Sequence, residues 1–70
     1  MRLTNNMVDI KVNNHGSIIL FTPLTTKAKR WVNENLPLES WQWLGKSFAV
    51  EPRYADDLVS GMQNDGLKVK

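Results

Sequence analysis

One histidine and a short acidic cluster are the residues best suited to catalysis or metal binding in this sequence. His15 is the only histidine, and it has no partner at the spacing of a catalytic or metal-binding motif. Glu51, Asp56 and Asp57 are close enough along the chain to bind a divalent ion, but acids near a helix start usually complement the helix dipole. We therefore predict no catalytic, cofactor-binding or metal-binding residue.

Two further patterns resemble enzyme motifs but lack essential parts. Gly45-Lys46-Ser47 matches the end of a phosphate-binding loop, but the upstream glycine and the following helix are missing. Ser40, Ser47 and Ser60 do not lie in a nucleophile elbow, and no histidine is near them in the sequence. The chain is also too short to provide much of a cleft, so the sequence does not favour an enzyme.

Basic residues gather where a helix is expected to begin. Lys27, Lys29 and Arg30 occupy its first turns, where cations oppose the helix dipole, so helix stability does not explain them. They form either a solvated helix face or a surface for an anionic partner, which would be nucleic acid or an acidic protein. With neighbouring polar residues, the candidate partner-binding set is Lys27, Lys29, Arg30, Gln42, Lys46 and Arg53. A tryptophan exposed beside Gln42 and Lys46 on an uncovered sheet face would complete a platform for single-stranded nucleic acid.

Composition limits the chain to one small globular domain, residues 1–70. The 70 residues carry a net charge of +2, are 41% hydrophobic and include three tryptophans, which is typical of a folded domain near the lower size limit. The absence of cysteine excludes disulfides and thiolate metal sites and favours a reducing, cytoplasmic location. No signal peptide or membrane-spanning segment is recognisable, so we expect a soluble protein in which residues 1–6 form a flexible leader.

Periodicity predicts a β-hairpin followed by a helix. Residues 8–12 alternate between apolar and polar side chains, and residues 17–22 form a second apolar run after a turn at 13–16. Apolar residues at helical spacing follow this hairpin, at positions 28, 31, 32 and 36. We expect a helix at about residues 25–35 that begins at a threonine cap and ends before Pro37.

Gly45 lies in the middle of a tryptophan-rich stretch, residues 41–50, and determines which side chains share a face there. With Gly45-Lys46 as a two-residue hairpin turn, the large side chains on both sides of it converge on one face. The expected pairs are Trp43 with Phe48 and Trp41 with Val50. A glycine bulge within a single strand is the alternative.

A second helix completes the predicted fold. Residues 53–64 show helical spacing, Gly66 marks a C-terminal stop, and residues 68–70 suit a short edge strand. The order is β-β-α-β-(β)-α-(β), an α+β domain with two helices packed on one face of a small antiparallel or mixed sheet. We expect the core to combine Trp31 and the sheet tryptophans with three residues of the second helix, Tyr54, Leu58 and Met62.

A longer pattern extends over residues 15–69. It consists of Gly16-Ser17-Ile18, Thr22 to Thr25, Ala28, Trp31, Glu34, Trp43, Gly45, Val50 to Tyr54, Asp57 to Val59, Gly61-Met62 and Asp65 to Leu67. This pattern resembles a group of short uncharacterised proteins encoded by proteobacterial phages, plasmids and genomic islands. The resemblance implies a mobile-element origin without a known activity, and no functional residue is carried over from it.

These observations predict a non-enzymatic bacterial accessory protein that acts by binding another macromolecule. A protein is the preferred partner, and a homodimer is compatible with the same features. The alternative is a small nucleic-acid-binding module that uses the basic helix patch. We expect no cofactor and no membrane partner.

Overall fold

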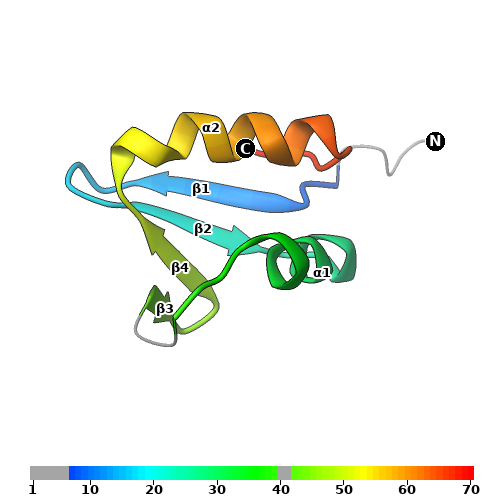
Figure 1. Cartoon of the computed structure of the whole chain (residues 1–70), viewed down its shortest axis with the longest axis horizontal. Coiled ribbons are helices and arrows are strands. Elements are labelled where there is room, and N and C mark those ends of the chain that lie inside the picture. The colour runs from blue at the N-terminus through cyan, green and yellow to red at the C-terminus, as the bar shows by residue number, and fades with distance from the viewer. Residues whose placement is uncertain (1–6, 40–41) are drawn as a thin grey trace.

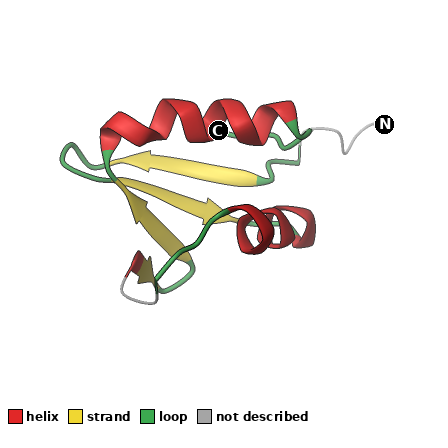
Figure 2. Cartoon of the chain, viewed as in Figure 1, coloured by secondary structure: helices red, strands yellow, loops and turns green. Residues whose placement is uncertain are grey.

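The computed structural model (Figure 1) describes residues 7–39 and 42–70. The described elements are, in order, β1 (Ile10–Asn14), β2 (Ile19–Pro23), α1 (Thr26–Asn35), β3 (Trp43–Leu44), β4 (Ser47–Val50) and α2 (Pro52–Asn64). The strands form one antiparallel sheet in the order β1-β2-β4-β3 (Figure 2). The predicted α+β class and element order are confirmed. The expected leader, residues 1–6, lies outside the described residues.

One apolar face of the sheet is turned toward both helices. Phe21 lies opposite Phe48 across β2 and β4, and Ile19 lies opposite Val50. Because side chains alternate along a strand, these four share one face. With side chains from both helices they form a single core, whose buried residues are Ile10, Ile19, Phe21, Ala28, Val32, Phe48, Met62 and Leu67. Both helices therefore cover the same face of the sheet, as predicted.

The other face, called the open sheet face below, carries polar and smaller apolar side chains. Thr22 and Ser47 share a hydroxyl hydrogen bond of 2.6 Å across β2 and β4. Leu20 lies opposite Ala49 in the same register. Neither α1 nor α2 packs on this face, because their buried side chains belong to the core on the opposite side.

Three aromatic rings meet in the core. Phe21 and Phe48 stack with their centroids 5.5 Å apart and their planes 11° apart, and both are fully buried. Trp43 contacts Phe48 edge to face at 5.3 Å. The predicted hairpin pairing of Trp43 with Phe48 is confirmed, and Gly45 has the positive φ, +66°, that such a tight turn requires. The second predicted pair includes Trp41, which lies outside the described residues.

The predicted core position of Tyr54 is wrong. Its side chain is 54% exposed, whereas Met62, further along the same helical stripe, is fully buried. Leu58, between them, is half-buried. Burial rises along the stripe because α2 meets the core with its C-terminal half. Trp31 is also only half-buried, and its indole N–H donates to Asp65 Oδ2 at 2.6 Å at the rim of the core.

Asp9 joins three segments that are far apart in the sequence. Its Oδ1 accepts a hydrogen bond from the Thr25 hydroxyl at 2.7 Å, and its Oδ2 accepts one from the Lys68 backbone N–H at 2.9 Å. The Thr25 oxygen in turn accepts the Ala28 N–H at 3.1 Å and caps α1. The pKa of the Asp9 carboxyl lies below its ordinary value of 3.8, chiefly because of the Lys68 hydrogen bond and then the Thr25 hydrogen bond.

The C-terminal segment closes α2 and reaches the sheet. The backbone N–H groups of Gly66 and Leu67 donate to the carbonyls of Gln63 and Met62, and Leu67 then turns into the core. The predicted edge strand is reduced to one parallel bridge between Val69 and Ile10, since the segment runs alongside only the start of β1. Among the described residues, no helix combines the length and the apolar character needed to cross a membrane.

Two glycines in and after α2 should respond oppositely to alanine. A Cβ added at Gly61 would lie 3.9 Å from Trp31 Cζ2, which is an ordinary contact. Gly61→Ala should therefore raise the free energy of unfolding by about 0.5–1 kcal/mol through helix propensity. Gly66→Ala should lower it by about 1–2 kcal/mol, because a φ of +89° disfavours a side chain. Urea denaturation measures both changes, and a less stable Gly61→Ala would contradict the described packing of Trp31.

Asp9→Asn should destabilise the protein in a pH-dependent way. Since the folded pKa is lowered, the ionised carboxyl stabilises the fold above the unfolded pKa of about 4, and this contribution is lost as pH falls through the folded pKa. We expect a loss of about 1–2 kcal/mol at neutral pH, because an amide can accept only one of the two hydrogen bonds. The loss should shrink in acid. A difference in urea denaturation that stayed constant from neutral pH into acid would show that the charge of Asp9 is not involved.

Candidate functional site

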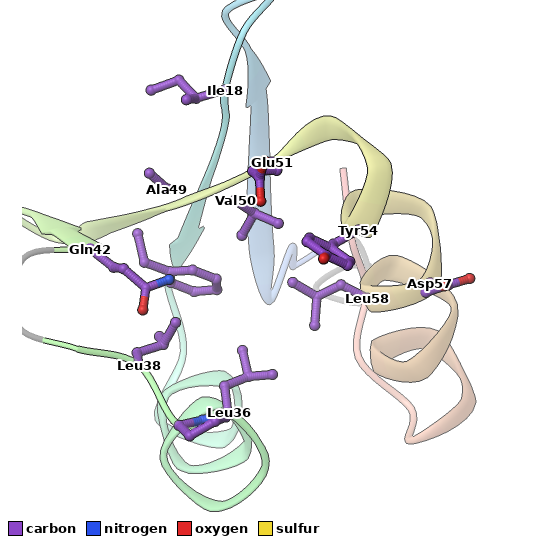
Figure 3. A pocket seen from close by; sticks show the side chains of 12 residues that line it. Ile18, Leu36, Leu38, Gln42, Ala49, Val50, Glu51, Tyr54, Asp57 and Leu58 are labelled. Carbon is purple, nitrogen blue, oxygen red and sulfur yellow. The ribbon is translucent and has the colours of Figure 1, made fainter.

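An apolar groove opens between the C-terminal end of α1 and the N-terminal half of α2 (Figure 3). Its volume is about 640 Å³. Figure 3 shows Leu36 and Leu38 on one side, Tyr54 and Leu58 on the other, and Val50 between them. The full lining is Ile18, Leu36, Pro37, Leu38, Gln42, Phe48, Ala49, Val50, Glu51, Tyr54, Asp57 and Leu58. We call this feature the apolar groove.

The local sequence keeps the apolar groove open. The backbone of Leu36 is extended rather than helical, with φ −118° and ψ 123°, because this residue precedes Pro37. Residues 37–39 then belong to no helix or strand, so α1 does not extend across the first turns of α2. The Tyr54 ring therefore stays exposed at the edge of the groove.

The charged residues that line the apolar groove, Glu51 and Asp57, are both acidic, and Figure 3 shows the Asp57 carboxylate at the outer side of α2, pointing away from the cavity. Glu51 lies 3.6 Å from Arg53 in an exposed ion pair, a contact of the kind that adds little stability. The Arg53 guanidinium also lies over the Tyr54 ring, 5.1 Å from its centroid. Gln42 Oε1 accepts the Glu39 N–H at 3.0 Å, which holds this side chain at the groove edge. The arrangement is suited to binding apolar side chains next to a cation.

A second pocket lies beside the middle of α1. Its volume is about 380 Å³, and its lining is Thr22, Pro23, Leu24, Lys29, Asn33, Trp43 and Lys46. It shares no lining residue with the apolar groove. Two of the predicted partner-binding residues, Lys29 from α1 and Lys46 from the β3–β4 turn, meet here. We call this feature the lysine pocket.

Lys27 has an internal partner. Its ammonium donates a hydrogen bond of 3.0 Å to the Gly66 carbonyl, directly after α2. The C-terminal end of a helix dipole attracts cations. The position of Lys27 is thus explained by the stability of α2, which sequence reasoning confined to the first helix did not consider.

The other predicted partner-binding residues lie apart from the lysine pocket. Gln42 lines the apolar groove, and Arg53 contacts Glu51 and Tyr54 at its rim. Arg30 is exposed on α1 and lines neither cavity. The six residues therefore do not form one basic surface.

The predicted platform for single strands on the open sheet face is not formed by the described residues. Trp43 faces the helices because it pairs with Phe48, whose ring is in the core. Gln42 lies in the apolar groove rather than on the open sheet face. Trp41 lies outside the described residues.

The residues considered for catalysis or metal binding are not brought together. α2 begins at Pro52, so Asp56 and Asp57 lie beyond its first turn, where the dipole acts most strongly. Within residues 7–39 and 42–70, no three His, Asp or Glu side chains are grouped as metal ligands. His15 is exposed in the turn between β1 and β2.

Sequence reasoning missed the apolar groove. It assigned Leu58 and Tyr54 to the core and gave no functional role to Leu36 and Leu38. A usable signal was present, because Leu36 and Leu38 flank a proline that ends a helix. Apolar side chains that continue where the backbone stops being helical cannot all follow the helix into the core.

No family model, curated protein or solved structure matches this chain.

Lys27→Ala and Lys29→Ala form a matched pair that separates structural from binding lysines. Both changes remove one charge from the first residues of α1, at positions two residues apart. Lys27→Ala should lower the free energy of unfolding by about 0.5–1 kcal/mol, since it removes a cation from the end of α2. Lys29→Ala should change it by less than about 0.5 kcal/mol. Equal effects of the two substitutions in urea denaturation would argue against a capping role for Lys27.

Proposed function

We propose that this chain is a non-enzymatic accessory protein that binds a segment of a partner protein in the apolar groove. The observation that carries the proposal is an open cavity of about 640 Å³ with mainly apolar walls in a domain of 70 residues. So small a domain has few apolar side chains to spare from its core. Leaving several of them around an open groove is a feature of binding sites.

The walls of the apolar groove support a peptide segment as the occupant. Leu36, Leu38 and Leu58 offer aliphatic surface, and Tyr54 offers an exposed ring with a hydroxyl. Aromatic residues of this kind often supply much of the affinity at protein interfaces. Grooves bordered by helices typically accept the apolar stripe of an amphipathic helix.

Charge narrows the choice of segment. The charged lining residues Glu51 and Asp57 are acidic, and both are exposed. A partner segment with a lysine or arginine beside its apolar residues would complement them. A segment with acidic flanks would be repelled.

The cellular context of the proposal comes from the sequence. The chain has no cysteine, which suits a reducing cytoplasm. Its resemblance to short phage and plasmid proteins supports a role in a bacterial mobile element. A partner would then be a host or element protein in the same compartment.

Site-specific photo-crosslinking tests the proposal. The photoreactive amino acid p-benzoylphenylalanine is placed at position 54 in the groove, or at position 44 on the β3–β4 hairpin, as a control. Tyr54 and Leu44 are both 54% exposed, so the two probes are equally accessible. In the native host, irradiation should give a discrete adduct with another protein from position 54 and none from position 44. The cross-linked peptide should be apolar and flanked by a basic residue.

Two acidic residues of α2 provide a matched charge control. Asp57→Lys, in the groove lining, should strongly reduce the adduct from position 54, whereas Asp56→Lys, outside the lining, should not. Absence of an adduct from position 54, or equal adducts from positions 54 and 44, would overturn the proposal. A crosslink between two copies of the chain would show that the groove binds a second copy of this protein rather than a different partner.

A further inference from the structure

The lysine pocket is assembled from three separate segments. Lys29 and Asn33 are one turn apart on α1 and share a helix face. Trp43 and Lys46 come from the β3–β4 hairpin, and Leu24 comes from the link between β2 and α1. The pocket therefore depends on the tertiary fold and is independent of the apolar groove.

The cationic side of the lysine pocket is not neutralised within the described residues. Among the described residues, the ion pair joins Arg53 to Glu51, which both lie outside this pocket. Neither Lys29 nor Lys46 is paired with a carboxylate of the described residues. Two ammonium groups that line one cavity repel each other. An anion bound between them would remove that repulsion and accept charge-assisted hydrogen bonds.

The opposite side of the lysine pocket is apolar and aromatic. The Trp43 ring is held by its edge-to-face contact with Phe48, and it is half-buried. Its indole N–H donates no hydrogen bond within the described part of the chain, in contrast to that of Trp31. Pro23 and Leu24 continue the apolar wall. A fixed indole suits stacking by a planar ring of the ligand.

Together these features point to a ligand that joins a planar ring to an anionic group. We propose that the lysine pocket binds a nucleoside phosphate, with its phosphate between Lys29 and Lys46 and its base against Trp43. The Asn33 amide would then hydrogen bond the base edge or the sugar. A volume of about 380 Å³ accommodates a single small ligand. The nucleoside phosphate is either a free nucleotide or one residue of a nucleic-acid single strand.

NMR titration of the full chain tests the assignment. The probes are adenosine monophosphate, inorganic phosphate, a six-residue oligothymidylate and a glutamate-rich peptide. Adenosine monophosphate should shift the Trp43 indole N–H and the backbone amides of Lys29, Asn33 and Lys46. Signals of Val50 and Leu58 in the apolar groove should stay unchanged. Tighter binding of the oligonucleotide than of the mononucleotide would identify a single strand as the source, and the reverse would identify a free nucleotide.

Matched variants separate a site from general charge attraction. Lys29→Gln and Lys46→Gln should each weaken binding about tenfold. Lys11→Gln and Arg30→Gln remove one charge each from exposed positions outside the pocket and should leave affinity unchanged. Trp43→Phe should lower the affinity for adenosine monophosphate more than the affinity for inorganic phosphate.

Four results would overturn the proposal. These are no shift with either nucleotide probe, equal affinity for inorganic phosphate and adenosine monophosphate, equal affinity for the glutamate-rich peptide, and equal losses in the pocket and control variants. The first would leave the pocket without this ligand. The other three results would show that the lysine pocket attracts anions without selecting a nucleoside phosphate. None of them bears on the apolar groove, because the two cavities share no lining residue.

Discussion

The stacked pair of Phe21 and Phe48 is the interaction on which the rest of this domain depends. The two rings belong to neighbouring strands, lie 5.5 Å apart and are fully excluded from water. In a chain of 70 residues, two large buried rings supply much of the apolar area that offsets chain entropy. Phe48 also contacts Trp43, so the position of the β3–β4 hairpin follows from the same stack. Both cavities include residues of this hairpin or of β4.

Polar contacts that close the fold are concentrated at one end of the molecule. Asp9 links the start of β1 to the cap of α1 and to the C-terminal segment. Trp31 and Lys27 link α1 to the residues that follow α2. The apolar groove lies elsewhere, between the residues that follow α1 and the first turns of α2. Loss of one of these polar contacts would therefore affect stability, and so would changes at Phe48 or Val50 in the groove, whereas the exposed groove residues Glu51 and Tyr54 can vary with less cost to the core.

The two cavities have opposite chemistry, which suits different ligands. The apolar groove combines aliphatic walls with acidic residues, and the lysine pocket combines a tryptophan with two cations. A protein segment with basic flanks and a nucleoside phosphate would not compete for the same place. If both proposals hold, the domain would bring a protein segment and a nucleotide or nucleic acid together.

Local patterns in the sequence determined the elements and several of their boundaries. Two kinds of local signal act within a few positions of the chain. Apolar side chains repeat every second residue in the strands and every third or fourth residue in the helices, so they predict these elements. The turn and cap residues Thr25, Pro37, Gly45 and Gly66 predict where the elements end. The face shared by Trp43 and Phe48 followed from one turn glycine for the same reason. Only the tertiary structure decided which part of α2 reaches the core, and Tyr54 was misplaced because its spacing matches that of Met62 while its distance from the core does not. It also decided that Lys27 serves a second helix, that Asp9 joins three segments, and that Lys29 and Lys46 line the same pocket. Each of these arrangements joins residues many positions apart, whose approach depends on how the helices pack on the sheet.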